Sequence, residues 1–87
     1  MYRFALGEIR NIGIEITSRS GDVFEITNAT CKVIRHNETV STQAATVDGA
    51  RVLTLFSADA PGVSVAQFSY TIGAEKFITP VEVEVSG

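Results

Sequence analysis

Hydrophobic and polar residues alternate along several stretches of the chain, and this alternation is its clearest structural signal. Ile12, Ile14 and Ile16 recur at every second position, with polar residues or glycine at the positions next to them. Because successive side chains of a β-strand point to opposite faces, this pattern predicts a strand with one face in a core and the other in water. Residues 66–72 and 77–85 alternate in the same way and predict two further strands.

The alternation changes phase near Thr27-Asn28. Phe24 and Ile26 lie at even-numbered positions, whereas the apolar residues directly after this point lie at odd-numbered ones. A shift of one residue reverses which side chains face the core, so the change marks either a β-bulge within one strand or a corner between two strands. We favour the corner, which places one strand at 23–27 and the next at 29–35.

Short clusters of turn-forming residues separate the predicted strands. Asp48-Gly49 is the strongest of them, because both residues tolerate positive φ and apolar residues flank them. It predicts a hairpin that leads into a strand at 51–56. Residues 36–38 and 73–74 predict two more tight turns, and 39–46, rich in Thr, Ser and Ala, is typical of an exposed edge strand.

These elements predict an all-β domain, specifically an immunoglobulin-like β-sandwich of about seven mostly antiparallel strands. Strand-length runs separated by turn signals at roughly 8 to 12 residue intervals are typical of such sandwiches, and no segment has the apolar spacing of a helix. The inward phase of each run gives the predicted core: Ile12, Ile14, Ile16, Phe24, Ile26, Cys31, Val33, Leu53, Leu55, Phe68, Tyr70, Ile72, Val81 and Val83.

The chain length of 87 residues suits one domain, so we assign residues 1–87 to a single sandwich. Residues 1–8, in which Tyr2, Phe4 and Leu6 alternate, are either an arm that pairs with a neighbouring subunit or an extra strand of the same sheet, and we favour the strand. Folding at this size buries only about 60 to 65 % of the surface of the extended chain, which leaves room for stabilisation by self-association.

Composition and charge exclude several classes of protein. With 45 % hydrophobic and 20 % charged residues, the chain has the composition of a folded globular protein. Its seven basic residues are scattered and the net charge is −3, so nothing concentrates the positive field that a nucleic-acid partner requires. A single cysteine excludes an intrachain disulfide framework. The sequence shows neither a signal peptide nor a transmembrane run, which predicts synthesis in a reducing cytoplasm and no membrane partner.

Cys31 and His36 are the only cysteine and the only histidine. Cys31 shares the inward phase of its strand, so we interpret it as a core residue rather than a nucleophile. If both residues belong to one extended segment, roughly 16 Å separates them, and no Cys-His pair forms. One cysteine and one histidine also fail to make a structural zinc site without several carboxylates.

The acidic residues are better interpreted as surface charges than as ligands or acids. Asp22, Glu38 and Asp59 would gather at one end of the sandwich if the chain turned a corner near residue 28, and such loop oxygens can hold calcium. We interpret them as solvated loop carboxylates. Glu82 and Glu84 share the outward face of one strand, with no pocket to raise the pKa of a general acid, and are typical of a charged surface that discourages aggregation.

The sequence therefore predicts no catalytic residue, no cofactor-binding residue, no metal-binding residue and no cofactor. It contains no glycine-rich phosphate loop, no Ser-His-Asp set and no tryptophan for a sugar platform. We do not expect an enzyme. A surface for protein contact needs none of these groups, only shape, apolar area and unpaired strand edges.

Three segments together carry a resemblance to a known group of proteins. They are residues 24–30, the Asp48-Gly49 turn and residues 68–73 before a valine-rich strand. Their order resembles that of small Ig-like domains in phage structural proteins, in particular the N-terminal domain of phage baseplate upper proteins, over Ile12 to Val85. Proteins of this group often continue into further domains, whereas this sequence ends after its last predicted strand. We expect either a short gene product or one domain of a longer protein.

The resemblance implies a non-catalytic structural or assembly module of a phage or prophage particle, in the tail, baseplate or head decoration. Such a protein is a virion component made in the bacterial cytoplasm, and its partners are other copies of itself or another virion protein. No catalytic residue is carried over. The alternative is a sugar- or peptide-binding Ig-like module of a bacterial surface or secreted protein. We rank it second, because the aromatic residues mostly follow the inward phase and no export signal is present.

Overall fold

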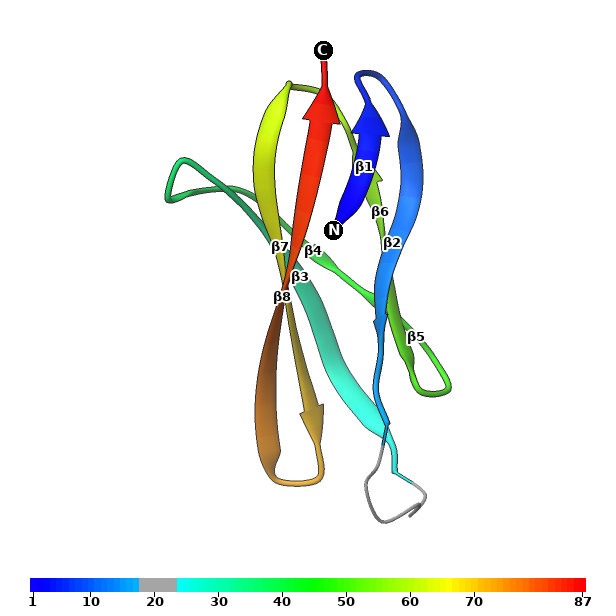
Figure 1. Cartoon of the computed structure of the whole chain (residues 1–87). Helices are drawn as coiled ribbons and strands as arrows, with labels where there is room; N and C mark the ends of the chain where they lie inside the picture. The colour runs from blue at the N-terminus through cyan, green and yellow to red at the C-terminus, as the bar shows by residue number, and fades with distance from the viewer. Residues whose placement is uncertain (18–23) are drawn as a thin grey trace.

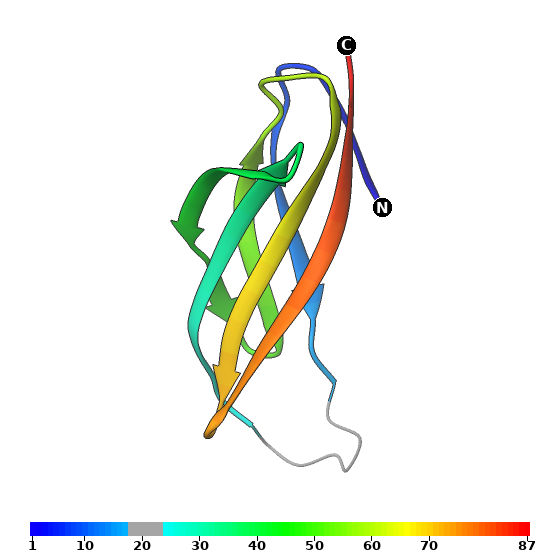
Figure 2. The same ribbon diagram turned by 90° about the vertical axis from the view of Figure 1, so that its left-hand side faces the viewer.

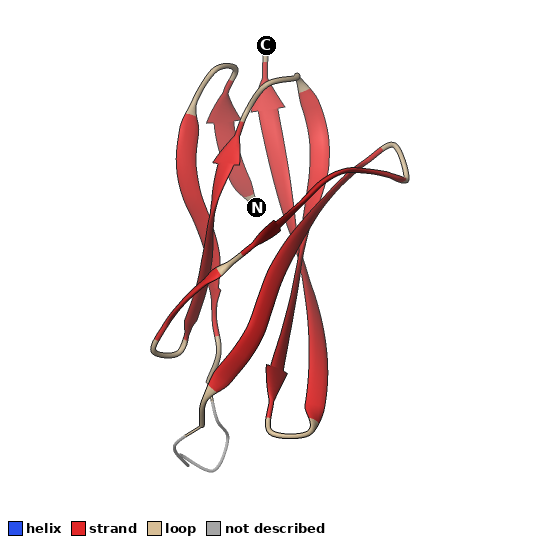
Figure 3. Cartoon of the chain, turned by 180° about the vertical axis from the view of Figure 1, so that it is seen from behind, coloured by secondary structure: helices blue, strands red, loops and turns tan. Residues whose placement is uncertain are grey.

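The computed structural model describes residues 1–17 and 24–87, and all regular structure in this part of the chain is β-strand (Figure 3). The strands are β1 (Tyr2–Ala5), β2 (Ile9–Glu15), β3 (Ile26–Arg35), β4 (Glu38–Ala44), β5 (Thr46–Asp48), β6 (Arg51–Ser57), β7 (Gly62–Ile72) and β8 (Glu75–Ser86). The all-β prediction is thus confirmed. In residues 1–17 and 24–87, no helix is long and apolar enough to cross a membrane.

The strands form two sheets that lie face to face (Figures 1 and 2). One has five strands in the order β1-β8-β7-β3-β4, and the other has three in the order β2-β6-β5. Every pairing is antiparallel except that of β1 with β8. Side chains from both sheets fill the space between them, so the molecule has the layered arrangement of a sandwich.

The core is built from alternate positions of the strands in both sheets. Its buried apolar members are Phe4, Ile12, Ile26, Ala29, Cys31, Val33, Val52, Phe56, Ala58, Ala66, Phe68, Tyr70, Val83 and Val85. Phe68, in the middle of β7, is fully buried, and such burial of a large side chain contributes about 1.5 to 3 kcal/mol. The predicted core residues Ile14, Ile16, Phe24, Ile72 and Val81 are partly buried and pack against this cluster.

The predicted phase of β6 is wrong. Val52, Thr54 and Phe56 face the core, whereas Leu53 is half-buried and Leu55 is 58 % exposed. The strand carries apolar residues in both phases, and the central residue of the phase that faces the core is a threonine. The alternation of hydrophobic residues therefore predicted that the leucines face the core. Thr54 is tolerated inside because its hydroxyl accepts a hydrogen bond from another side chain.

The predicted corner near Thr27-Asn28 is also wrong, and the alternative of a bulge holds. β3 is one strand that pairs with β7 on both sides of a register shift between Thr27 and Thr30. Asn28 has a φ of 53°, in the left-handed region that asparagine adopts more readily than most residues. Of the strand expected at 23–27, Val23 lies outside the described residues.

The three predicted turns are confirmed, one of them with a shift of a residue. His36 and Asn37 join β3 to β4 with φ angles of 54° and 63°, as a two-residue hairpin requires. Gly73, with a φ of 62°, begins the turn between β7 and β8. In the β5–β6 hairpin the two loop residues are Gly49 and Ala50, because Asp48 still pairs with Arg51.

Residues at the N-terminus provide an extra strand of the same sheet. β1 runs parallel to β8, with Tyr2 beside Val83 and Ala5 beside Ser86. Phe4 is buried and packs edge-on against Phe56 of the opposite sheet, with ring centroids 5.2 Å apart. β1 therefore belongs to the sandwich, through its backbone and through its aromatic side chain.

Candidate interaction surface

Cys31 and His36 do not form a chemical site. Cys31 is fully buried as a free thiol, and loss of hydration there raises its pKa to about 11, so the sulfur is protonated at neutral pH. His36 is exposed in the turn beyond the end of β3. A thiol of this kind packs like a small apolar side chain.

The acidic residues are also spread apart. Asp22 lies outside the described residues, and Asp59 forms an ion pair with Arg35 at 3.5 Å. Glu82 and Glu84 lie on the outer face of the five-stranded sheet, beside Val65 and Val63 of β7. In the part of the chain that the structure describes, no three His, Cys, Asp or Glu side chains come together as a metal site.

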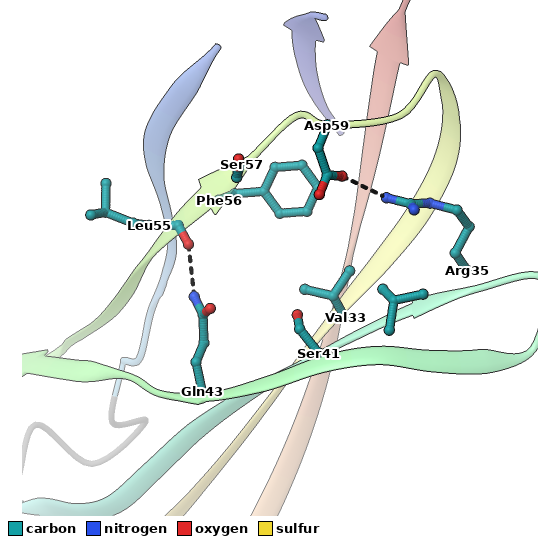
Figure 4. Close-up of a pocket in the computed structure, with 9 residues that line it drawn as sticks. Val33, Arg35, Ser41, Gln43, Leu55, Phe56, Ser57 and Asp59 are labelled. Carbon is teal, nitrogen blue, oxygen red and sulfur yellow. Dashed lines mark hydrogen bonds and ion pairs between the residues drawn. The ribbon is translucent and has the colours of Figure 1, made fainter. Parts of the chain in front are cut away.

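A groove lies between β4 and β6, on one open side of the sandwich (Figure 4). Its cavity volume is about 230 Å³. Core side chains form its floor, and polar side chains stand at its two ends (Figure 4). The residues that line it are Val33, Arg35, Val40, Ser41, Gln43, Leu55, Phe56, Ser57 and Asp59. The groove thus exposes a small part of the core along an edge of each sheet.

Arg35 closes one end of the groove. Its Nε donates a hydrogen bond of 3.2 Å to Oγ of the buried Ser64 on β7, and its Nη2 lies 3.5 Å from a carboxylate oxygen of Asp59. The side chain is largely buried, whereas that of Asp59 is largely exposed. Arg35 therefore ties the end of β3 both to β7 and to the loop between β6 and β7.

Gln43 bridges the groove from β4 to β6. Its Nε2 donates hydrogen bonds to the hydroxyl of Thr54 and, at 2.7 Å, to the backbone carbonyl of Leu55 (Figure 4). β5 pairs with β6 only as far as Leu53, so the carbonyl of Leu55 lies on a stretch of strand edge that β5 leaves uncovered. The side chain takes the place of a neighbouring strand at that point.

On the opposite side of the sandwich, the side chain of Tyr2 also takes the place of a neighbouring strand, here at the edge of β2. Its hydroxyl donates to the carbonyl of Gly13 on β2 at 3.0 Å and accepts a hydrogen bond from the N–H of the same residue at 3.1 Å. Gly13 leaves room for close packing here, since a Cβ atom would lie 2.7 Å from the carbonyl oxygen of Val52. Neither bridge could be predicted from the sequence, because lone Tyr and Gln residues in strands are common.

Comparison with known proteins identifies no relative. No protein-family model, curated protein or solved structure matches this chain. The surface itself is therefore the basis for inferring a function.

An apolar stripe runs along the outer face of the three-stranded sheet. It consists of Ile9 on β2 and Leu53 and Leu55 on β6, and it is called the Leu stripe below. Ile9 is 63 % exposed and Leu55 is 58 % exposed. Asn11 stands opposite Leu55 and Gly13 opposite Leu53, so neither neighbour on β2 covers the leucines with a large apolar side chain. Sequence alternation predicted the opposite phase for β6, with Leu53 and Leu55 in the core.

The aromatic residues contribute little to the surface. Of the five phenylalanines and two tyrosines, Phe77 is the most exposed, at 39 %. It stacks on Tyr70, with ring centroids 5.6 Å apart and an interplanar angle of 17°. The hydroxyl of Tyr70 in turn lies 3.1 Å from that of Thr79. A single stacked ring at a strand pair offers no broad aromatic platform.

Proposed function

We propose that this chain is a non-catalytic structural or assembly module of a phage or prophage particle, acting through protein–protein contacts in the tail, baseplate or head decoration. The observation that carries the proposal is the Leu stripe. Clustered apolar side chains on the outer face of a sheet are typical of protein contact sites. The resemblance in the order of elements supports the assignment to a particle.

We propose further that the sandwich is immunoglobulin-like. In that fold one sheet contains strands B, E and D, and the other contains G, F and C, with C′ added beside C in some members. The order β2-β6-β5 agrees with the first sheet and β8-β7-β3-β4 with the second. β1 then adds to the edge formed by β8. This agreement in strand order supports the proposal.

The alternative of a sugar- or peptide-binding surface module has less support. Carbohydrate sites commonly stack sugars on exposed aromatic rings, and the most exposed aromatic side chain here is the single Phe77. In the groove beside Gln43, the side chains of Arg35 and Gln43 already bond to the protein. We therefore keep the assembly module as the conclusion.

The direct test is to look for the chain in particles. Phage induction of the bacterium that encodes it, followed by particle purification and immunodetection, should recover the chain at several copies per particle. Leu55→Glu should lower incorporation by about tenfold, because it places a charge in the Leu stripe. Val63→Glu is the control, since Val63 is similarly exposed, at 52 %, on the other sheet. A chain that is absent from particles and found in the cell envelope would favour the alternative.

A further inference from the structure

We propose that β4 is a dimerisation edge, at which two copies of this chain join their five-stranded sheets by antiparallel pairing of β4 with β4. The two-fold axis passes beside Gln43. This inference rests on the proposed function as an assembly module, and it names a second copy as the partner. Its basis is that side chains protect the other long strand edges, whereas part of the β4 edge is unprotected.

The outer edge of β1 is covered by side chains. Nη2 of Arg10 donates a hydrogen bond to the backbone carbonyl of Arg3, and a carboxylate oxygen of Glu8 accepts the N–H of Ala5. Both groups belong to β1 and point away from β8, and an incoming strand would need to displace them. Side chains placed in this way are one means by which proteins block pairing at an edge.

The other long edges are protected too. The Tyr2 hydroxyl occupies both backbone groups of Gly13 on β2, and Gln43 occupies the carbonyl of Leu55 on β6. β1 pairs with β8 only from Val83 onward, which leaves residues 75–82 of β8 at an edge. That stretch carries Lys76 and Pro80, and lysine and proline are the residues that most often prevent pairing at an edge.

The edge of β4 lacks such protection along the second half of the strand. Ile34 pairs with Thr39 and Val33 with Ser41, so Val40 is an extra residue that bulges from the edge. A bulge disrupts pairing locally and protects the first half of the strand. Beyond it, residues 41–44 carry no charged side chain and no proline. They form a regular and uncharged edge.

The backbone groups of Thr42 and Ala44 point outward along this edge. A two-residue turn joins Ile72 to Glu75, so these two residues form a hydrogen-bonded pair. Hydrogen-bonded and non-hydrogen-bonded pairs alternate along the strands, from β8 to β7 and then from β7 to β3. Followed from Ile72, this alternation directs the backbone N–H and C=O groups of Cys31 toward Gln43 on β4. The residues on either side of Gln43 therefore direct their N–H and C=O groups away from the sheet. Among the described residues, none forms a hydrogen bond with these groups.

A second copy fits this edge because the segment is complementary to itself. With the axis beside Gln43, Thr42 of each copy stands opposite Ala44 of the other, and the two pairs exchange four backbone hydrogen bonds. The side chains that meet, including the two Gln43 side chains at the axis, are all neutral. Each copy carries a net charge of −3, so an uncharged contact avoids adding local repulsion to the general one.

The expected dimer is weak. Pairing over residues 41–44 buries less area than the roughly 1,200 to 2,000 Å² of a stable complex, so we expect a dissociation constant from about 10 µM to 1 mM. Weak contacts of this kind become effective in a particle, where many copies are held close together.

Sedimentation velocity over the same concentration range tests the edge. The wild-type chain should show a monomer–dimer equilibrium, and Thr42→Lys should lower its association constant by at least about tenfold. Thr27→Lys is the matched control, because Thr27 is exposed on β3 but lies outside the region that pairs with β4. It should change the constant less than about threefold. A monomer throughout the range, or equal effects of the two lysines, would overturn the inference.

The register is tested by a disulfide. In a pair that is not hydrogen-bonded, facing Cα atoms are about 4.5 Å apart, so Gln43→Cys should yield a covalent dimer on mild oxidation. Thr39→Cys, on the same strand, should not, because its position would face Val47 of the second copy. Cys31 is fully buried and does not interfere. Cross-linking of both variants, or of neither, would contradict the proposed axis.

The two proposals fail separately. A chain that is monomeric in solution but present in particles would remove the β4 dimer and leave the assembly function in place. A chain that dimerises through β4 but is absent from particles would remove the proposed function alone.

Discussion

Two side chains, Tyr2 and Gln43, hold the facing edges of the two sheets together. Each starts on an outermost strand of the large sheet and ends on backbone groups of the small sheet. The small sheet has only three strands, so much of its length is edge. These hydrogen bonds satisfy backbone groups that would otherwise depend on water.

Tyr2→Phe should reveal what one bridge contributes. The change leaves the N–H and C=O of Gly13 without their partner and should lower the free energy of unfolding by about 1 to 2 kcal/mol, measured by urea denaturation. Tyr70→Phe is a matched control, because its hydroxyl has one side-chain partner, Thr79, rather than two backbone partners. A smaller loss for Tyr2→Phe than for Tyr70→Phe would contradict this role.

Cys31 should make stability depend on alkaline pH. Its pKa is about 11 in the folded state against 9.0 for an unperturbed thiol, so the unfolded chain loses the proton first. The contribution is fully present below pH 9 and is lost as pH rises toward 11, on the order of 3 kcal/mol in total. Unfolding of wild type and Cys31→Ala should be compared at pH 8 and pH 10.5. A parallel decline in both proteins would exclude the thiol as its cause.

At the scale of elements, β2 and β6 approach each other closely at one point. A Cβ on Gly13 would meet the Val52 carbonyl oxygen at 2.7 Å and overlap the side chain of Leu53. Gly13→Ala should therefore cost about 1 to 3 kcal/mol in thermal or urea unfolding. Adding Leu53→Ala removes the side-chain overlap but not the carbonyl contact, so it should restore part of the loss. No destabilisation by Gly13→Ala would show that the strands can separate freely.

Alternation of hydrophobic residues predicted the strands and turns well where one face is clearly apolar, as in β2, β7 and β8. It failed in β6, where valine, leucine and phenylalanine occupy both phases and a satisfied threonine faces the core. It also left the change of phase in β3 undecided, because a bulge and a corner both reverse the faces. Only pairing with β7 on both sides separates them.

At the scale of the whole molecule, the features proposed to act in function were hidden from the sequence. The Leu stripe arises from the reversed phase of β6, and the contrast among strand edges depends on contacts such as Arg10 with Arg3 and Gln43 with Leu55. Each of those contacts joins residues on strands of two different sheets, and only the register within the two sheets brings these residues together. The expectation of no catalytic or metal site rests on the scarcity of the residues that build one, and it stays a prediction.

The parallel pairing of the first and last strands has a mechanical consequence. Tension that draws Tyr2 and Ser86 apart pulls β1 and β8 in opposite directions along their length, so the load falls on the whole ladder between them in shear. Hydrogen bonds loaded in this way must break together rather than one after another. A domain joined to its neighbours through these two strands would transmit force while its core remains closed.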